Sequence, residues 1–150
     1  MRIIENYVSN KFELDVLNLI PNKINNTNHR NQIIRYGSKV PYSPFNVSTV
    51  IPELFNFIDV MEFDSVTINE YRKGQSVNWH IDDPKGGPHI GIISLVSDGT
   101  LFFRKGTELK NILLPRFSLA IMSDELRYDW EHSFTATGPR VSVVFRNSKF

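Results

Sequence analysis

The chain has 150 residues, enough for one domain (1–150), and its 17 Lys and Arg against 16 Asp and Glu give a formal net charge of +1 at pH 7. This balance excludes the strongly basic surface typical of many nucleic-acid-binding domains, so any such binding must be local. The absence of cysteine excludes disulfides and thiolate metal sites, and the eleven Phe, five Tyr and two Trp favour an aromatic-rich β fold.

The N-terminal part of the chain predicts a strand and a helix. Residues 3–8 are short, apolar and partly β-branched, as in a strand. They contain no long apolar run, so we expect no secretory signal, no membrane span and a cytoplasmic protein. Asn10 can cap a helix, Glu13 can close its capping box, and Pro21 should stop it. Residues 22–31 carry five Asn and indicate a polar loop.

Residues 33–46 mix aromatic residues, basic residues and prolines without a clean period. One interpretation is a strand followed by a turn-rich surface loop. The other is a substrate lid, in which Arg35, Tyr36 and Tyr42 would contact the substrate.

The rest of the chain predicts one more helix and then strands. Ser48 or Thr49 can cap the helix, Pro52 fits its first turn, and it should end near Phe63. Runs rich in β-branched and aromatic residues follow, separated by turn residues, at 65–71, 90–96, 100–104, 109–113, 117–122 and 141–146. We therefore expect a mainly β fold with flanking helices (α+β), in the form of a double-sheet sandwich, barrel or jelly roll.

Three residues in the second half of the chain offer metal ligands. His80 and Asp82 point to one face of an extended segment, as Asn69 and Tyr71 do. An isolated His-x-Asp is often a surface turn, and His132 alone could be an ordinary buried histidine. Together the three supply the two imidazoles and one carboxylate of non-haem Fe(II) sites with open positions.

The final strand places Arg140, Ser142 and Arg146 on one face and apolar residues on the other. On an edge strand this face would simply be solvated. If it is buried, the two guanidinium groups need anionic partners and could bracket a small dianion. 2-Oxoglutarate suits such a site, because it can chelate Fe(II) through its C1 carboxylate and keto oxygen while an arginine holds its C5 carboxylate, with one position left for O₂.

Five motifs, in this order and spacing, resemble the AlkB family of Fe(II)- and 2-oxoglutarate-dependent dioxygenases: Asn69-x-Tyr71-x-x-Gly74, His80-x-Asp82, Ser94-Leu95, Arg127-Tyr128-x-Trp130-x-His132 and Arg140-x-Ser142-x-x-x-Arg146. The resemblance implies a double-stranded β-helix (jelly roll) and the use of Fe(II), 2-oxoglutarate and O₂. It also implies that His80, Asp82 and His132 bind iron. Tyr71 and Arg140 would hold the C5 carboxylate, Asn69 and Arg146 would lie at the C1 end, and Tyr42 would belong to a lid over the modified base. Ser142 stands where the family often carries Asn and would offer a shorter hydrogen bond between the arginines.

The implied activity is oxidative removal of an alkyl group from, or hydroxylation of, a nucleobase. The expected partner is single-stranded DNA or RNA, and the expected state is a monomer. Two alternatives stay open. One is a hydroxylase of a protein or small molecule, because DNA-repair members carry an acidic residue where this chain has Pro84. The other is a non-catalytic nucleic-acid-binding β-helix module.

Overall fold

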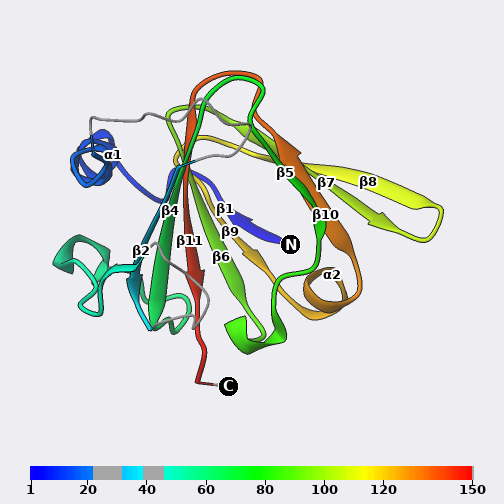
Figure 1. Ribbon diagram of the computed structural model, residues 1–150, viewed down its shortest axis with the longest axis horizontal. Coiled ribbons are helices and arrows are strands. Elements are labelled where there is room, and N and C mark those ends of the chain that lie inside the picture. The colour runs from blue at the N-terminus through cyan, green and yellow to red at the C-terminus, as the bar shows by residue number, and fades with distance from the viewer. Residues whose placement is uncertain (22–31, 39–45, 150) are drawn as a thin grey trace.

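The computed structural model of the protein describes residues 1–21, 32–38 and 46–149, and most of them belong to two facing β-sheets (Figure 1). The larger sheet has the strand order β1-β9-β6-β11-β4-β2-β3, and the smaller sheet has the order β5-β10-β7-β8. The strands of the larger sheet are β1 (Arg2–Ile4), β9 (Leu119–Met122), β6 (Ile90–Leu95), β11 (Arg140–Arg146), β4 (Ser65–Tyr71), β2 (Gln32–Gly37) and β3 (Asn46–Ser48). Those of the smaller sheet are β5 (Ser76–His80), β10 (Glu131–Thr135), β7 (Gly99–Lys105) and β8 (Glu108–Leu114). The predicted two-sheet, mainly β architecture is confirmed.

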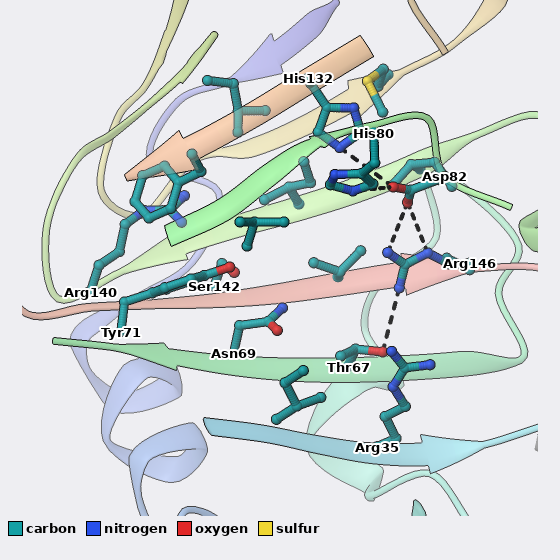
Figure 2. Close-up of a pocket in the computed structure, with 18 residues that line it drawn as sticks. Arg35, Thr67, Asn69, Tyr71, His80, Asp82, His132, Arg140, Ser142 and Arg146 are labelled. Carbon is teal, nitrogen blue, oxygen red and sulfur yellow. Dashed lines mark hydrogen bonds and ion pairs between the residues drawn. The ribbon is translucent and has the colours of Figure 1, made fainter. Parts of the chain in front are cut away.

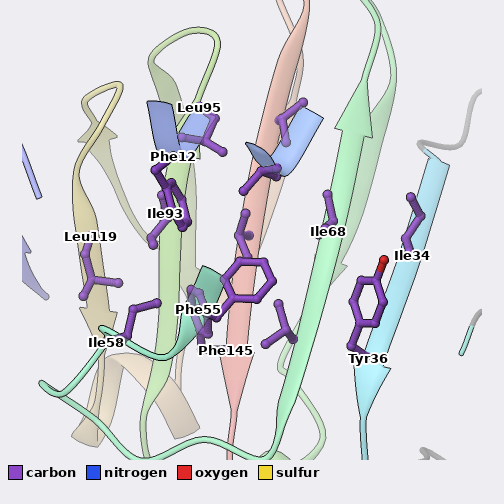
Figure 3. Close-up of a cluster of buried hydrophobic side chains, with 14 of the residues drawn as sticks. Phe12, Ile34, Tyr36, Phe55, Ile58, Ile68, Ile93, Leu95, Leu119 and Phe145 are labelled. Atoms are coloured by element: carbon purple, nitrogen blue, oxygen red, sulfur yellow. The ribbon is translucent and has the colours of Figure 1, made fainter. Parts of the chain in front are cut away.

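Side-chain alternation gives the larger sheet two different faces. The outer face is apolar and packs against α1 (Asn10–Leu17) and the 3-10 turn η1 (Glu53–Phe55), with Phe12 and Phe55 at the centre of the contact (Figure 3). Phe55 is fully buried and meets Phe145 of β11 edge to face, with 5.8 Å between the ring centres. This cluster closes one side of the sheet, so polar residues on the other face must point toward the smaller sheet.

The inner face of the larger sheet combines apolar and polar side chains. A second apolar cluster joins the two sheets and includes Ile92 and Val144 from the larger sheet and Leu101 and Phe103 from the smaller one. The polar residues of the inner face lie beside this cluster, on β4 and β11. They are therefore placed between the sheets, on the opposite side from α1.

The helical predictions are only partly correct. The first predicted helix is present as α1, but its cap is Ser9, which accepts a hydrogen bond from the Phe12 N–H. Asn10 is already part of the helix. Glu13 accepts a hydrogen bond from Arg116 and does not close a capping box. The second predicted helix is wrong: residues 49–63 contain only the turn η1.

Several local elements differ from the expectations. The predicted strand at residues 3–8 is β1, which ends at Ile4, and the predicted strand at 117–122 begins at Leu119. The extended segment expected at His80 and Asp82 is β5, which ends at His80, so Asp82 lies beyond it. The strand β10, the short helix α2 (Asp124–Tyr128) and the 3-10 turn η2 (Pro84–Gly86) were not predicted. In the described ranges, no helix has the length and apolar character that crossing a membrane requires.

Candidate metal centre and adjoining pocket

The two histidines are brought together by the ladder between β5 and β10. His80 and His132 are directly opposite in this antiparallel pair, so their side chains share one face, and their ring centres are 4.3 Å apart. Asp82 follows two residues after His80, beyond the end of β5. One ligand atom from each of the three residues lies within 4.8 Å of the other two, and the side chains converge in Figure 2. The predicted triad is thus assembled in space.

The hydrogen bonds of His80 show that this triad suits a cation. Its Nδ1 lies 2.7 Å from the Asn78 carbonyl oxygen, which can only accept, so Nδ1 carries the proton. In the neutral ring Nε2 then presents a lone pair, and it faces Oδ1 of Asp82 at 3.1 Å. Nε2 of His132 faces the same oxygen at 3.4 Å. The His80 lone pair and the carboxylate oxygen repel each other unless a proton or a metal ion lies between them. With Nε2 of His132 converging on the same oxygen, the donor set fits Fe(II).

Arg146 orients the carboxylate of this triad. Its Nη2 and Nε donate to Oδ2 of Asp82 at 2.8 and 3.1 Å, which leaves Oδ1 for the imidazoles. Burial alone would raise the pKa of Asp82, but Arg146 and the hydrogen bonds with the two histidines outweigh it and hold that pKa well below its ordinary range. The hydrogen bond with Asp82 in turn raises the pKa of His80. Asp82 is therefore a carboxylate throughout the physiological pH range.

The other end of the pocket contains a buried guanidinium group. Arg140 is 3% exposed, and its Nη2 donates to Ser94 Oγ at 2.9 Å. Its guanidinium also lies over the Phe134 ring, 4.6 Å from the centre. No carboxylate in the described part of the chain forms an ion pair with it, and its Nε has no hydrogen-bond partner there. Burial lowers the pKa of Arg140 to about 10. An anion bound in this pocket would stabilise the charged form of the guanidinium.

Tyr71 lies next to this arginine and faces the same space. The two residues are paired across β4 and β11. Burial raises the pKa of the Tyr71 phenol, against the lowering influence of Arg140 and of a hydrogen bond with Ser142. The phenol therefore stays protonated and can donate a hydrogen bond to an anion held by Arg140.

One cavity of about 230 Å³ connects the metal triad with Arg140. It brings together eight predicted residues, His80, Asp82, His132, Asn69, Tyr71, Arg140, Ser142 and Arg146, and the predicted substrate contact Arg35 also lines it (Figure 2).

The other two predicted substrate contacts are not in this cavity. The prediction for Tyr36 is wrong. Alternation along β2 turns its side chain away from Arg35 and toward the apolar outer face of the larger sheet, on the same strand as Ile34 (Figure 3). Tyr42 lies outside the described residues. Of the predicted lid at 33–46, residues 33–37 form part of β2 and are paired with β4, residues 39–45 are not described, and Asn46 begins β3.

Three polar residues had no predicted role but contact the site. Thr67 accepts from Nη1 of Arg146, and Ser94 accepts from Arg140. Ser94 interrupts an otherwise apolar strand, a signal that the sequence already contained, whereas Thr67 lies in a strand with several polar residues and gives no such signal. The third is Arg127, whose guanidinium binds the backbone of the segment that follows Asp82.

Comparisons with known proteins agree with this geometry. A family model described as the 2OG-Fe(II) oxygenase superfamily matches residues 5–146. Over 75 residues, 48% of this chain, the sequence is 39% identical to the tRNA (carboxymethyluridine(34)-5-O)-methyltransferase ALKBH8 of Macaca fascicularis. It is 25% identical over 141 residues to the uncharacterized protein L905 of Acanthamoeba polyphaga mimivirus, with 80% of this chain and 67% of that protein covered. The match spans only 11% of ALKBH8.

The solved structure of OsALKBH1 superposes with a TM-score of 0.72 at 14% sequence identity, and the match covers 97% of each chain. At this identity the likeness concerns the fold alone. It confirms the predicted double-stranded β-helix.

Proposed function

The chain belongs to the 2OG-Fe(II) oxygenase superfamily, and we propose that it is an AlkB-type dioxygenase that removes an alkyl group from, or hydroxylates, a nucleobase in DNA or RNA. The superfamily uses Fe(II), 2-oxoglutarate and O₂. The observation that carries the proposal is a single cavity with a two-histidine, one-carboxylate triad at one end and the buried Arg140, without an ion-pair partner among the described residues, at the other.

His80, Asp82 and His132 would hold the iron. When bound, the iron supplies the oxidative chemistry: 2-oxoglutarate loses CO₂ and becomes succinate with one oxygen atom of O₂, and the other atom enters a C–H bond of the substrate. The protein must order the cosubstrate, keep its two ends apart and exclude water.

The wall formed by β4 and β11 is suited to ordering the cosubstrate. Arg140 and the Tyr71 phenol would bind the C5 carboxylate, with Ser142 beside them. Asn69 lies nearer the triad and would meet the C1 end, as would Arg146, which already contacts Asp82 (Figure 2). Because these residues sit on two paired strands, their spacing is set by the sheet and changes little when the cosubstrate binds.

Support for a nucleobase substrate comes from a relative and from the shape of the site. The name of ALKBH8 places its activity on tRNA, and the shared segment is 75 residues long. Arg35 lines the cavity from β2 and would contact the substrate there, together with Tyr42 of the predicted lid. The proposed substrate is single-stranded DNA or RNA, because a base must leave its stack to reach a cavity between two sheets. The proposed form is a monomer with a single domain over residues 1–150.

The experiment is succinate release by iron-loaded protein with 2-oxoglutarate, with and without short single-stranded DNA and RNA that carry methylated bases. The His132→Ala variant, treated identically, is the control for contaminating iron chemistry. We expect one oligonucleotide to stimulate wild-type release. If neither DNA nor RNA stimulated succinate release, a nucleobase substrate would be rejected. If no succinate were released at all, the proposed enzymatic activity would be rejected.

A protein or small molecule is the second candidate substrate. The side chain of Asp83 accepts a hydrogen bond from the Lys85 N–H and caps the turn η2. Pro84 follows it, at the position where DNA-repair members carry an acidic residue. Slow release that no oligonucleotide stimulates would favour this candidate, while nucleic-acid binding without turnover would favour the non-catalytic module.

A further inference from the structure

Arg127 has an unusual environment for a charged residue. It belongs to α2, is 1% exposed and is the largest fully buried side chain of the described residues. No acidic side chain in the described ranges forms an ion pair with it. Its guanidinium donates instead to three backbone carbonyl oxygens: Nη1 to Asp82 at 2.9 Å, Nη2 to Asp83 at 2.8 Å and Nε to Gly87 at 3.0 Å. A charged side chain is stable in the interior only where hydrogen bonds replace its hydration, as these three do. The cost of burying the charge indicates that Arg127 has a specific role.

These three carbonyls belong to the loop that carries the metal-site carboxylate. The strand β5 ends at His80 and β6 begins at Ile90, so Asp82 lies outside every β ladder of the described chain. The loop has a turn of its own, in which the Gly86 N–H donates to Asp83 and the Gly87 N–H donates to Pro84. Arg127 binds both the start and the end of this turn, and its bond to the Asp82 carbonyl holds the main chain at that residue.

Gly87 makes the third contact possible. Its φ of 84° lies in the left-handed region, which a residue with a Cβ adopts only with strain. In this conformation its carbonyl oxygen is directed at Nε of Arg127. The loop therefore closes around the guanidinium at both ends.

Arg127 also connects two parts of the triad. It precedes His132 by five residues, and α2 leads directly into β10, the strand that carries this histidine. Figure 1 shows α2 and the end of β5 at the same end of the molecule. The two histidines are already registered by the β5–β10 ladder. The hydrogen bonds of Arg127 also connect the segment that carries His132 to the loop that carries Asp82.

We infer that Arg127 is a positioning residue of the metal site, which sets the Asp82 main chain so that its carboxylate meets both imidazoles before any metal binds. The inference rests on the proposed iron site. Arg146 fixes the side chain of Asp82 and Arg127 fixes its backbone, so the carboxylate is held at two points. The three carbonyls are bound by three different nitrogens of one rigid, planar guanidinium. A lysine ammonium has only one nitrogen and cannot reproduce this spacing.

The test compares Arg127→Lys with a variant that weakens the fold elsewhere. Arg116→Met is the matched control, because Arg116 binds the carboxylate of Glu13 in α1 on the other side of the larger sheet. Co(II) affinity is measured from visible absorbance, and the melting temperature is measured for each metal-free variant. We expect Arg127→Lys to bind Co(II) about 10- to 100-fold more weakly, which is the usual effect of substituting a residue that orients a metal ligand. Arg116→Met should lose thermal stability and keep the wild-type affinity.

Wild-type Co(II) affinity in folded Arg127→Lys would overturn the inference. Absence of Co(II) binding by the wild-type protein would instead overturn the metal site itself, so the two failures are distinguishable.

A measurement on the wild-type protein covers the case in which Arg127→Lys does not fold. Amide hydrogen exchange at Gly86 and Gly87 is followed with and without Co(II). A loop that Arg127 has already fixed should protect these amides equally in both states. Protection that arises only with Co(II) would show that the metal orders the loop, and would refute the inference.

Discussion

Substitution of Gly99 by alanine should weaken 2-oxoglutarate binding without touching the metal ligands. Gly99 opens β7 and lies against the guanidinium of Arg140. A Cβ at this position would be 2.2 Å from Nε, 2.6 Å from Cζ and 2.9 Å from Nη2 of that arginine. Non-bonded heavy atoms settle at roughly 3.5 Å, so the guanidinium would have to move by about 1 Å or more. The smaller sheet therefore leaves room for Arg140 only because residue 99 lacks a side chain.

The size of the effect follows from the contacts that this shift removes. The bond from Nη2 to Ser94 Oγ, now 2.9 Å, would be broken, and the anchor for the C5 carboxylate would be displaced. A hydrogen bond to a charged group contributes about 1.5–3 kcal/mol, which corresponds to a roughly 10- to 100-fold higher KM for 2-oxoglutarate. The clashing atoms are the end of a side chain and not backbone, so the sheet can persist while the arginine moves.

The assay measures succinate release as a function of 2-oxoglutarate concentration, together with Co(II) affinity and melting temperature. Gly138→Ala is the matched control, because a Cβ at Gly138 would meet nothing within 4 Å and its φ is not positive. We expect Gly99→Ala to raise the KM and keep Co(II) affinity, and Gly138→Ala to change neither. An unchanged KM in a folded Gly99→Ala protein would refute the placement of the cosubstrate carboxylate at Arg140.

Three further predictions concern the triad, the α1 contact and the outer core. His132→Ala should abolish Co(II) absorbance and succinate release while the melting temperature is retained, and residual release would refute the assignment. The hydrogen bond from Arg116 lowers the pKa of Glu13, although burial of the carboxyl acts in the opposite direction. The ionised Glu13 therefore stabilises the folded state above pH 4.5, and this contribution is lost as the pH falls further. In thermal melts Glu13→Gln should have a free energy of unfolding about 1 kcal/mol below that of the wild type at pH 7, and this difference should shrink below pH 4.5. Phe55→Ala should cost about 3–5 kcal/mol in urea unfolding because Phe55 is fully buried, and should leave the KM unchanged because the pocket is on the other face.

The features of the fold that sequence reasoning predicted are those set by local alternation. Along residues 140–146 the polar residues Arg140, Ser142 and Arg146 alternate with apolar ones, and only Val144 departs from the pattern. The structure gives β11 the polar inner face and the apolar outer face that this pattern predicts. The same rule explains the error at Tyr36. Its neighbour Arg35 faces the cavity, so adjacent residues on β2 cannot both contact a substrate.

The features that were missed depend on contacts between distant segments. Residues 49–63 have apolar residues at helical spacing, but Asn56 and Asp59 favour turns, and Phe55 and Ile58 are held by the outer face of the larger sheet and not by a helix. The ladder between β5 and β10 was missed because its paired residues are more than 50 positions apart in the sequence. No local pattern predicts such a pairing.

The site depends on the distance between the two sheets. The residues proposed to bind 2-oxoglutarate stand on β4 and β11, whereas the histidines stand on β5 and β10 of the smaller sheet. The apolar cluster between the sheets sets their separation, with Phe103 fully buried and Tyr71 in edge contact with Phe134 at 4.9 Å. Asp82 bridges the two walls, because its loop follows β5 while its carboxylate is bound by Arg146 of β11. A change in that cluster would therefore alter the distance from the metal to the cosubstrate anchor, even where every ligand is retained.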